Sequence, residues 1–326
     1  MREGVNPQKN KTCMNKRFFN RIIIPVYIPD EPDQYHEESD KIFEICLNSL
    51  RKTINLEKTA ITVINNGRSS RVKSIVFNNH DIIDKYVEYT FNKGKVYPIL
   101  NEARSCYEPY ITICDADVAF FEGWENAVFD IFKKFKKAGV VAPLPCQGLA
   151  LNNNSTLFFD NYFLGKVKYG KIVSKLDSEL YIKGLGNSAV YERNNRDFDW
   201  IQKQYFLEKD IVAIVGSGHF VATYKSSIFK GDYSFPKKVF ENGYEDEFID
   251  KLADINGFYR LSTRKSYAFH MGNKVDDYIN TIKQSLDSSI EINEFEIEFS
   301  TFQNTRNKTY FLRNFVFKGI RKFFNL

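Results

Sequence analysis

The chain has 326 residues, of which 43% are hydrophobic and 27% are charged, and its formal net charge is +5 at pH 7. This composition excludes a disordered or fibrous chain and is typical of a globular protein with one large domain or two small ones. A positive excess this small does not indicate a nucleic-acid-binding protein, so we expect no nucleic-acid partner.

The sequence gives no signal for export or membrane insertion. Residues 1–21 carry scattered charges and no apolar core, so we expect no secretory signal. No apolar run approaches the roughly 18 residues of a membrane-spanning helix. The cysteines form no C-x-x-C pair and have no histidine at zinc-site spacing, which is typical of buried thiols in a reducing compartment. They are Cys13, Cys46, Cys106, Cys114 and Cys146. We therefore expect a cytosolic protein.

Strands and helices alternate through the first half of the chain, after a flexible basic leader at residues 1–19. Strands are predicted at 21–27, 59–67, 110–114 and 140–145, and helices at 37–53 and 122–138, the last one ended by Gly139. Residues 91–104 predict a loop that leads into a helix. This alternation indicates an α/β protein with a mixed, mostly parallel sheet and helices on both faces. Ligands bind outside the carboxyl ends of such strands, so the polar residues that end each strand should converge on one rim.

The second half of the chain has weaker patterns. Residues 147–210 are rich in loop signals. Residues 210–227 predict a strand, a glycine turn and a second strand, and residues 244–263 predict a helix followed by a strand. A short strand should end at His270. We expect the main domain to cover residues 20–275 and residues 276–326 to form an appendage.

The motif Asp115-Ala116-Asp117 follows the apolar strand at 110–114. Residues i and i+2 lie on the same face of a strand, so the two carboxylates can hold one divalent cation. Mg²⁺ and Mn²⁺ prefer such oxygen ligands and readily add phosphate oxygens. A solvated turn is the structural alternative. A second D-x-D, at residues 197–199, has no strand to present it, and we give it little weight.

Carboxylates gather again at Glu245, Asp246 and Glu247, just after Tyr244, where a helix is predicted to begin. One of them can act as a general base at the edge of a cleft. The alternative is that they only offset the helix dipole, which is worth about 0.3–1 kcal/mol. His270 is a candidate ligand as well, although a single histidine more often has a structural role.

The glycine-rich segment Gly216-Ser217-Gly218 allows a ligand to approach the backbone closely. Its spacing fits neither a Walker P-loop nor a dinucleotide-binding motif. A tight hairpin between two strands is the structural alternative.

Taken in order, these segments resemble the inverting family 2 glycosyltransferases of the GT-A fold, over roughly residues 20–275. The stretch "IIIPVY" resembles the opening strand that receives the nucleotide base, and "ITICDADVAF" resembles the D-x-D strand. "FNKGKVYPILNEA" is similar to the segment ahead of that strand, "GSGHFVATYKSSIF" to the donor-sugar loop, and "YEDEFIDKLADINGFYRL" to the Glu-Asp helix with its glycine turn. "TVINNG" has Asn65 where the family usually has Asp, and residues 28–38 are longer than the usual turn.

The resemblance implies a role for each matching residue. Asp115, Asp117 and His270 would hold Mn²⁺ or Mg²⁺, and Asp246 would be the catalytic base, with Tyr244 and Glu245 on the acceptor side. The donor would be bound by Pro25, Tyr27, Asn65, Asn92, Lys95, Ala116, Gly216, Ser217 and Gly218. The implied donor is a nucleotide-diphosphate sugar, for which we favour UDP over GDP. The implied acceptor is a glycan or a lipid-linked glycan of surface polysaccharide synthesis.

The C-terminal residues 305–326 contain basic side chains and no acidic one. The basic residues are Arg306, Lys308, Arg313, Lys318, Arg321 and Lys322, and apolar residues at helical spacing are Leu312, Phe315, Val316, Ile320, Phe323 and Phe324. This pattern predicts a basic amphipathic helix, which suits an anionic membrane surface at the cytosolic side. The alternative is a helix packed on its own domain or on a second subunit of a homo-oligomer.

Two other functions fit parts of the sequence. A sugar-phosphate nucleotidyltransferase has a related sheet, but it should carry a basic glycine-rich loop after the first strand, where this chain has the acidic "PVYIPDEPDQ". A non-catalytic nucleotide- or glycan-binding protein would bind the nucleotide without turnover.

Overall fold

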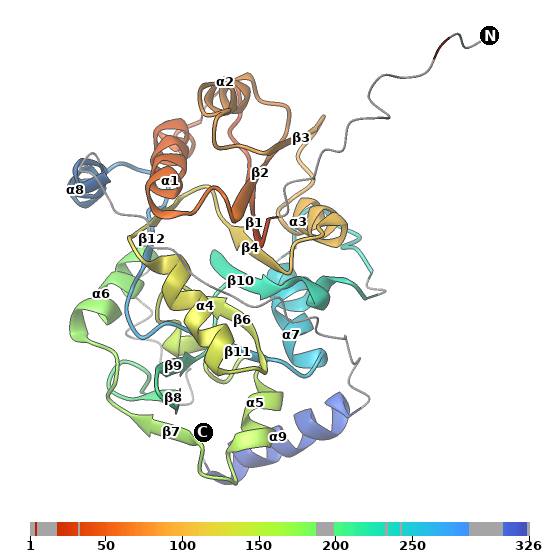
Figure 1. Cartoon of the computed structure of the whole chain (residues 1–326), viewed down its shortest axis with the longest axis vertical. Coiled ribbons are helices and arrows are strands. Elements are labelled where there is room, and N and C mark those ends of the chain that lie inside the picture. Colours follow the sequence, from red (N-terminus) through yellow and green to blue (C-terminus); the bar gives the residue numbers. More distant parts are fainter. Residues whose placement is uncertain are drawn as a thin grey trace.

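The computed structural model describes residue 4 and residues 18–31, 33–186, 199–231, 234–241, 243–286 and 309–324. A ten-stranded sheet runs through the molecule in the order β3-β2-β1-β4-β10-β6-β11-β9-β8-β7 (Figure 1). Its strands are β1 (Asn20–Val26), β2 (Thr59–Asn66), β3 (Lys85–Tyr89), β4 (Tyr110–Cys114), β6 (Ala138–Ala142), β7 (Val167–Gly170), β8 (Gln204–Glu208), β9 (Val212–Val215), β10 (Val221–Lys225) and β11 (Tyr259–Ser262). Seven of these ten strands run in one direction, and only β7, β9 and β10 run against them. The predicted α/β class with a mixed, mostly parallel sheet is confirmed.

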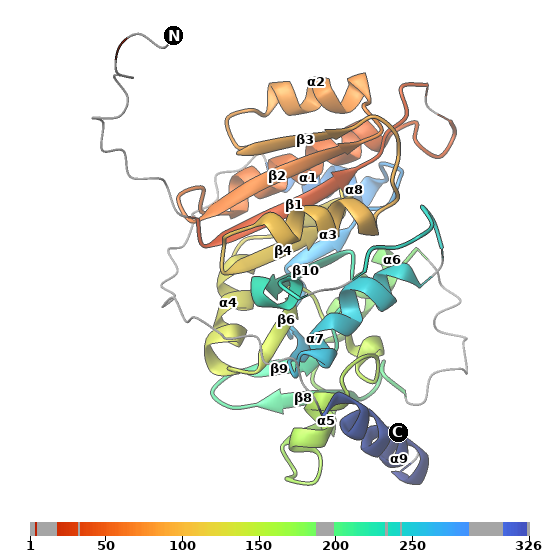
Figure 2. The ribbon, with the colours of Figure 1, turned by 90° about the vertical axis from the view of Figure 1, so that its right-hand side faces the viewer.

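Helices cover both faces of the sheet. They are α1 (Ser39–Thr53), α2 (Ser70–Asn78), α3 (Val96–Ser105), α4 (Trp124–Lys134), α5 (Ser155–Asn161), α6 (Lys175–Gly184), α7 (Lys251–Ile255), α8 (Asp277–Leu286) and α9 (Tyr310–Phe324). In Figure 1, α1 and α4 lie on one side of the sheet, and α3 and α7 lie on the other. Figure 2 shows α9 at the lower end of the molecule and α8 in its upper half, near α1. The chain is therefore a three-layer structure around one central sheet.

The central strands are apolar because both of their faces are covered. Ile22, Ile23 and Ile24 of β1 are fully buried, and the parallel register places Ile22 beside Ile61 of β2 and Thr112 of β4. Continuous apolar runs of this kind are typical of parallel strands between two helical layers. The three strands end at the same edge, so the residues that follow them meet there.

A second, two-stranded sheet pairs β5 (Val118–Phe120) with β12 (Ala268–His270) in antiparallel register. His270 lies opposite Val118, and the Met271 N–H donates to the Asp117 carbonyl at 2.7 Å. This small sheet brings the late histidine to the Asp115-Ala116-Asp117 turn.

The helix predicted at 122–138 ends earlier than expected. α4 stops at Lys134, and Gly139 belongs to strand β6. A Cβ atom at position 139 would lie 2.3 Å from the Phe258 Cβ, so the glycine allows close packing between a strand and its neighbour instead of ending a helix. The prediction of a helical stop at Gly139 was wrong.

The two strands around Gly216-Ser217-Gly218 do not form a hairpin. β10 lies between β4 and β6, whereas β9 lies beyond β11. The loop-rich reading of residues 147–210 was also incomplete, because this segment contains α5, β7, α6 and β8. β7 and β8 extend the far edge of the sheet by antiparallel pairing.

The C-terminal elements pack on the main body. α8 contacts α1, and α9 packs along α5, where the rings of Phe158 and Phe317 stack at 5.0 Å between centroids. Four cysteines are buried as free thiols, and Cys13 lies outside the described residues. Most of the predicted leader and residues 287–308 also lie outside them. Within the described part of the chain, no helix is long and apolar enough to cross a membrane.

Candidate active site

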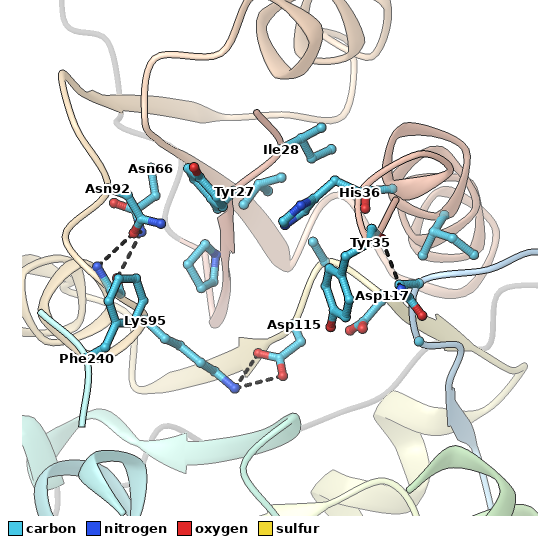
Figure 3. A pocket seen from close by; sticks show the side chains of 18 residues that line it. Tyr27, Ile28, Tyr35, His36, Asn66, Asn92, Lys95, Asp115, Asp117 and Phe240 are labelled. Atoms are coloured by element: carbon cyan, nitrogen blue, oxygen red, sulfur yellow. Dashed lines mark hydrogen bonds and ion pairs between the residues drawn. The ribbon is translucent and has the colours of Figure 1, made fainter. Parts of the chain in front are cut away.

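A cavity of about 340 Å³ opens at the carboxyl ends of β1, β2 and β4. Seven residues that the sequence analysis selected line it, namely Pro25, Tyr27, Asn92, Lys95, Asp115, Ala116 and Asp117. Figure 3 shows Tyr27, Ile28 and His36 on one side of the cavity and the Lys95–Asp115 pair on the opposite side. As predicted, polar residues that end these strands converge on one rim of the sheet.

Asp115 and Asp117 line this cavity and form a compact cluster with His270, which contacts Asp117 without lining the cavity itself. Each offers one ligand atom, and these atoms lie within 4.8 Å of one another. In the described structure the buried Asp117 Oδ1 has no hydrogen-bond partner, although buried carboxylate oxygens normally have one. A free carboxylate oxygen beside a second carboxylate and an imidazole is a suitable donor set for Mn²⁺ or Mg²⁺.

The ring of His270 is held by hydrogen bonds at both nitrogens. Nδ1 donates to the Gly184 carbonyl at 2.7 Å, and Nε2 lies 3.2 Å from Asp117 Oδ2. A backbone carbonyl on one ring nitrogen is the usual way of directing the other nitrogen toward a cation. Burial alone would lower the pKa of His270, but the hydrogen bond to Asp117 and its charge raise that pKa to about 9.

Lys95 neutralises the carboxylate of Asp115. Its Nζ lies 2.6 Å from Asp115 Oδ1 and 2.7 Å from Oδ2. Burial raises the pKa of the Asp115 carboxyl, Lys95 opposes this, and the charge of Asp117 adds to it. Because the two carboxylates repel each other, the cluster needs positive charge, and both Lys95 and the imidazole of His270 contact it.

Asn65 and Asn66 end β2, and the structure places the second one in the cavity. Asn65 is buried outside it, with Oδ1 accepting from the Ser69 N–H and Nδ2 donating to the Tyr86 hydroxyl. Asn66 lines the cavity and donates to Asn92 Oδ1 at 3.0 Å. Neighbouring residues of a strand point to opposite faces, so the pattern alone could not choose between them.

The glycine-rich loop lies behind the cavity rather than in its wall. Gly216 packs against the backbone of residues 146–150, and Ser217 is buried with its carbonyl accepting from Arg260 at 2.7 Å. Gly216, Ser217 and Gly218 are not part of the cavity lining. The loop reaches the site through the next residue, since the His219 carbonyl lies 3.5 Å from Lys95 Nζ.

The carboxylates at 245 and 246 face different neighbours. Glu245 contributes to the raised pKa of Lys95, after the larger effects of burial, which lowers it, and of Asp115, which raises it. Asp246 is exposed and accepts a hydrogen bond from Asn153 Nδ2 at 2.6 Å. Asp246 begins a π-helical turn, Asp246–Asp250, that leads into α7, and such turns are frequent at functional sites. Tyr244 packs edge-on against Phe248 and does not line the cavity.

The long segment after β1 contributes residues that the sequence analysis missed. Tyr35 and His36 line the cavity, and the rings of Tyr27 and His36 meet edge to face at 5.6 Å. Asn273 lines it as well and donates to the Tyr35 carbonyl at 3.0 Å. The unusual length of residues 28–38 was the available signal, but the sequence did not show where this segment folds.

Comparisons with known proteins give structural neighbours only. No protein-family model matches the sequence, and no curated protein matches it. The fold is similar to a crystal structure of S. aureus TarS 1-349, with a TM-score of 0.47 and 13% identity over 77% of this chain and 60% of that one. It is also similar to the complex of TarS 1-349 with UDP-GlcNAc, with a TM-score of 0.44 and 12% identity over 82% of this chain and 65% of that one.

A third neighbour is the mannosyltransferase PcManGT from Pyrobaculum calidifontis in complex with GDP-Man and Mn²⁺. Its TM-score is 0.42, with 14% identity over 77% of this chain and 55% of that one. The chain thus spans about 60% of the length of the first TarS structure.

Proposed function

We propose that this protein is a metal-dependent, inverting glycosyltransferase of the GT-A fold that uses a nucleotide-diphosphate sugar. The observation that carries the proposal is the Asp115–Asp117–His270 cluster, whose two aspartates line a cavity on the carboxyl edge of an α/β sheet and in which Asp117 Oδ1 has no hydrogen-bond partner among the described residues. A divalent cation bound there would neutralise the charge that develops on a leaving nucleoside diphosphate.

The cavity has the groups that such a donor needs. Tyr27 and His36 offer aromatic faces for a nucleobase at one side, and Asn66 and Asn92 offer amide groups for hydrogen bonds. Lys95 lies on the other side, next to the acidic cluster, where its ammonium group can contact a diphosphate. We favour a UDP-sugar over a GDP-sugar.

Proton transfer in this proposal is assigned to Asp246. The acceptor hydroxyl gives its proton to this carboxylate while its oxygen forms a bond to the sugar C1, and the C1–O bond to the diphosphate breaks on the opposite side. One displacement of this kind inverts the configuration at C1. Asp246 is exposed and begins the π-helical turn, so it is accessible to an acceptor, which we propose to be a glycan or a lipid-linked glycan.

The experiment that tests the function is a donor screen. The protein is incubated with Mn²⁺ or Mg²⁺ and with UDP-, GDP-, CMP- and TDP-sugars, and the released nucleotide is measured. Release of a nucleoside diphosphate from one donor, abolished in Asp117→Ala, is expected. The matched control is Asp199→Ala, which removes an aspartate of the other D-x-D sequence.

Two results would contradict the proposal. Formation of pyrophosphate from a sugar phosphate and a nucleoside triphosphate would identify a nucleotidyltransferase. Tight metal-dependent nucleotide binding without turnover, with a broad panel of glycan and lipid-linked acceptors present, would identify a binding protein.

A further inference from the structure

Helix α9 presents two different faces. Arg313, Phe317 and Ile320 are buried against the body, and Phe317 stacks on Phe158 of α5. This inward face realises the alternative of packing on the chain's own domain. Ile320, which the sequence pattern grouped with the apolar stripe, belongs to this inward face and not to the exposed one.

The outward face of α9 combines aromatic and basic side chains. Phe311 is 84% exposed and Phe315 is 76% exposed, and Lys318 and Lys322 are also exposed. These four residues follow the spacing i, i+4, i+7, i+11 and so form one stripe along the helix. Leu312 flanks the stripe and is 58% exposed. Exposed phenylalanines beside lysines, in a segment without acidic residues, are unusual on a helix that faces only water.

More exposed apolar side chains lie at the same end of the molecule. Phe163 and Leu164, in the turn after α5, are 66% and 65% exposed. The hydrogen bond from the Lys166 N–H to the Asn161 carbonyl closes this turn. Figures 1 and 2 both show α5 and α9 at the lower end, away from α1 and α2.

Lysine side chains gather in one cavity near this end of the molecule. A cavity of about 500 Å³ is lined by Lys136, Lys137, Lys166, Lys168 and Lys209. Lys137 is paired with Asp160, and Lys168 is paired with Glu208. Even with these pairs, the cavity lining contains five lysines and one acidic residue, Glu208. Through Asn161 and Lys166 it borders the turn that carries the exposed apolar pair.

We infer that the outward stripe of α9 and the turn after α5 together form a surface that binds an anionic lipid bilayer. The phenylalanines and Leu164 would enter the boundary between headgroups and acyl chains, and the lysines would contact the anionic headgroups. Charge complementarity favours a lipid surface over a second copy of this chain, because the same lysines would face each other across a symmetric dimer.

This surface lies next to the candidate acceptor side. Tyr310 and Asn314 of α9 line a cavity of about 330 Å³ together with Asn153 and Asp246. A bilayer held by α9 would therefore lie close to the carboxylate that we assign to the acceptor, which suits a lipid-linked acceptor. That consequence rests on the proposed function, whereas the binding surface itself does not.

Vesicle flotation with the full chain tests the inference. Vesicles of phosphatidylcholine with 30% phosphatidylglycerol are compared with vesicles of phosphatidylcholine alone. We expect binding to the anionic vesicles, weakened by added salt, and at least about a tenfold weaker partition for the double variants Phe311→Ser/Phe315→Ser and Lys318→Glu/Lys322→Glu.

Helix α2, at the end of the molecule opposite α9, offers a matched control. Phe77 of α2 is 76% exposed, the same fraction as Phe315, and Lys73 on the same helix is exposed too. Phe77→Ser/Lys73→Glu should float like the wild type.

All variants should keep the wild-type thermal midpoint, because they change exposed side chains. Wild-type protein that stays at the bottom with anionic vesicles, or stripe variants that float as well as the wild type, would overturn the inference. The inference would also be overturned if light scattering showed a dimer that the stripe variants abolish and that does not bind vesicles. No arm uses enzymatic turnover, so the result is independent of the donor screen.

Discussion

Lys95 and Asp115 form a bidentate ion pair in which Nζ lies within 2.7 Å of both carboxylate oxygens. Asp115 is thus fully engaged by an ammonium group, while Asp117 Oδ1 beside it has no hydrogen-bond partner within the described part of the chain. In the proposed function, a divalent cation would compete with this lysine for the same carboxylate. The lysine would stabilise the cluster without metal, and it would be free to contact a donor phosphate when a cation binds Asp115.

Replacing Lys95 by methionine should expose this relationship. Without the ammonium group, two neighbouring carboxylates share one imidazole, and we expect the free energy of unfolding without metal to fall by about 1–3 kcal/mol. Thermal unfolding should therefore show a lower midpoint in chelator and a larger upward shift with Mn²⁺ than in the wild type. Lys93→Met is the control, because Lys93 lies over the rings of Phe91 and Tyr97 and contacts no carboxylate of the cluster. An equal Mn²⁺ shift in wild type and Lys95→Met would disprove the competition.

Asp246 and Glu245 can be distinguished by paired variants. Asp246→Asn should keep donor binding and lose at least about a hundredfold in turnover, because the acceptor hydroxyl loses its proton acceptor. Glu245→Gln should keep turnover and lower the KM for the donor, because it removes a negative charge that acts on Lys95 and would repel a diphosphate bound there. Steady-state kinetics with nucleotide binding measured separately gives both quantities. If turnover falls in Glu245→Gln and survives in Asp246→Asn, the base is Glu245.

The segment after β1 gives a prediction about donor affinity. β12 ends at His270, and Asn273, shortly after it, donates a hydrogen bond to the Tyr35 carbonyl. Glu38 of the same segment accepts from the Val275 N–H at 2.9 Å. Asn273→Ala should free Tyr35 and His36 and raise the donor KM several-fold with little change in kcat, because both residues line the cavity and neither is assigned to proton transfer. Asn161→Ala removes a comparable side-chain bond, to the Leu157 carbonyl, away from this cavity and should leave KM unchanged. A fall in kcat with constant KM would show that the segment acts on the chemical step instead.

Much of this site could be predicted because its chemistry is local in sequence. The D-x-D turn follows a fully buried strand, and an apolar run that ends in two carboxylates is visible without a structure. The order of strands and helices gave the α/β class for the same reason, since alternation and apolar runs are local patterns.

The rest depended on pairing between distant segments. His270 reaches Asp117 only because β12 pairs with β5, and no spacing in the sequence encodes that contact. A hairpin was one alternative for the glycine loop because β9 and β10 are close in sequence, but β6 and β11 lie between them in the sheet. Short elements such as β7 have mostly exposed side chains, so their apolar pattern was too weak to detect.

Glu125 gives a prediction about stability against pH. It is 4% exposed on α4, where it accepts from the Thr59 hydroxyl at 2.5 Å and from the Asn55 N–H at 2.9 Å. Burial raises the pKa of its carboxyl to about 7, against the opposing effect of these hydrogen bonds. The folded protein therefore binds a proton that the unfolded chain releases near its ordinary pKa of 4.5, so this group's contribution to stability falls as the pH rises from about 4.5 to about 7. Glu125→Gln should remove that loss and raise the free energy of unfolding at pH 8 by up to about 3 kcal/mol relative to the wild type. Urea unfolding at pH 5 and pH 8 measures it. A difference between variant and wild type that is the same at both pH values would mean that Glu125 is charged in the folded protein throughout.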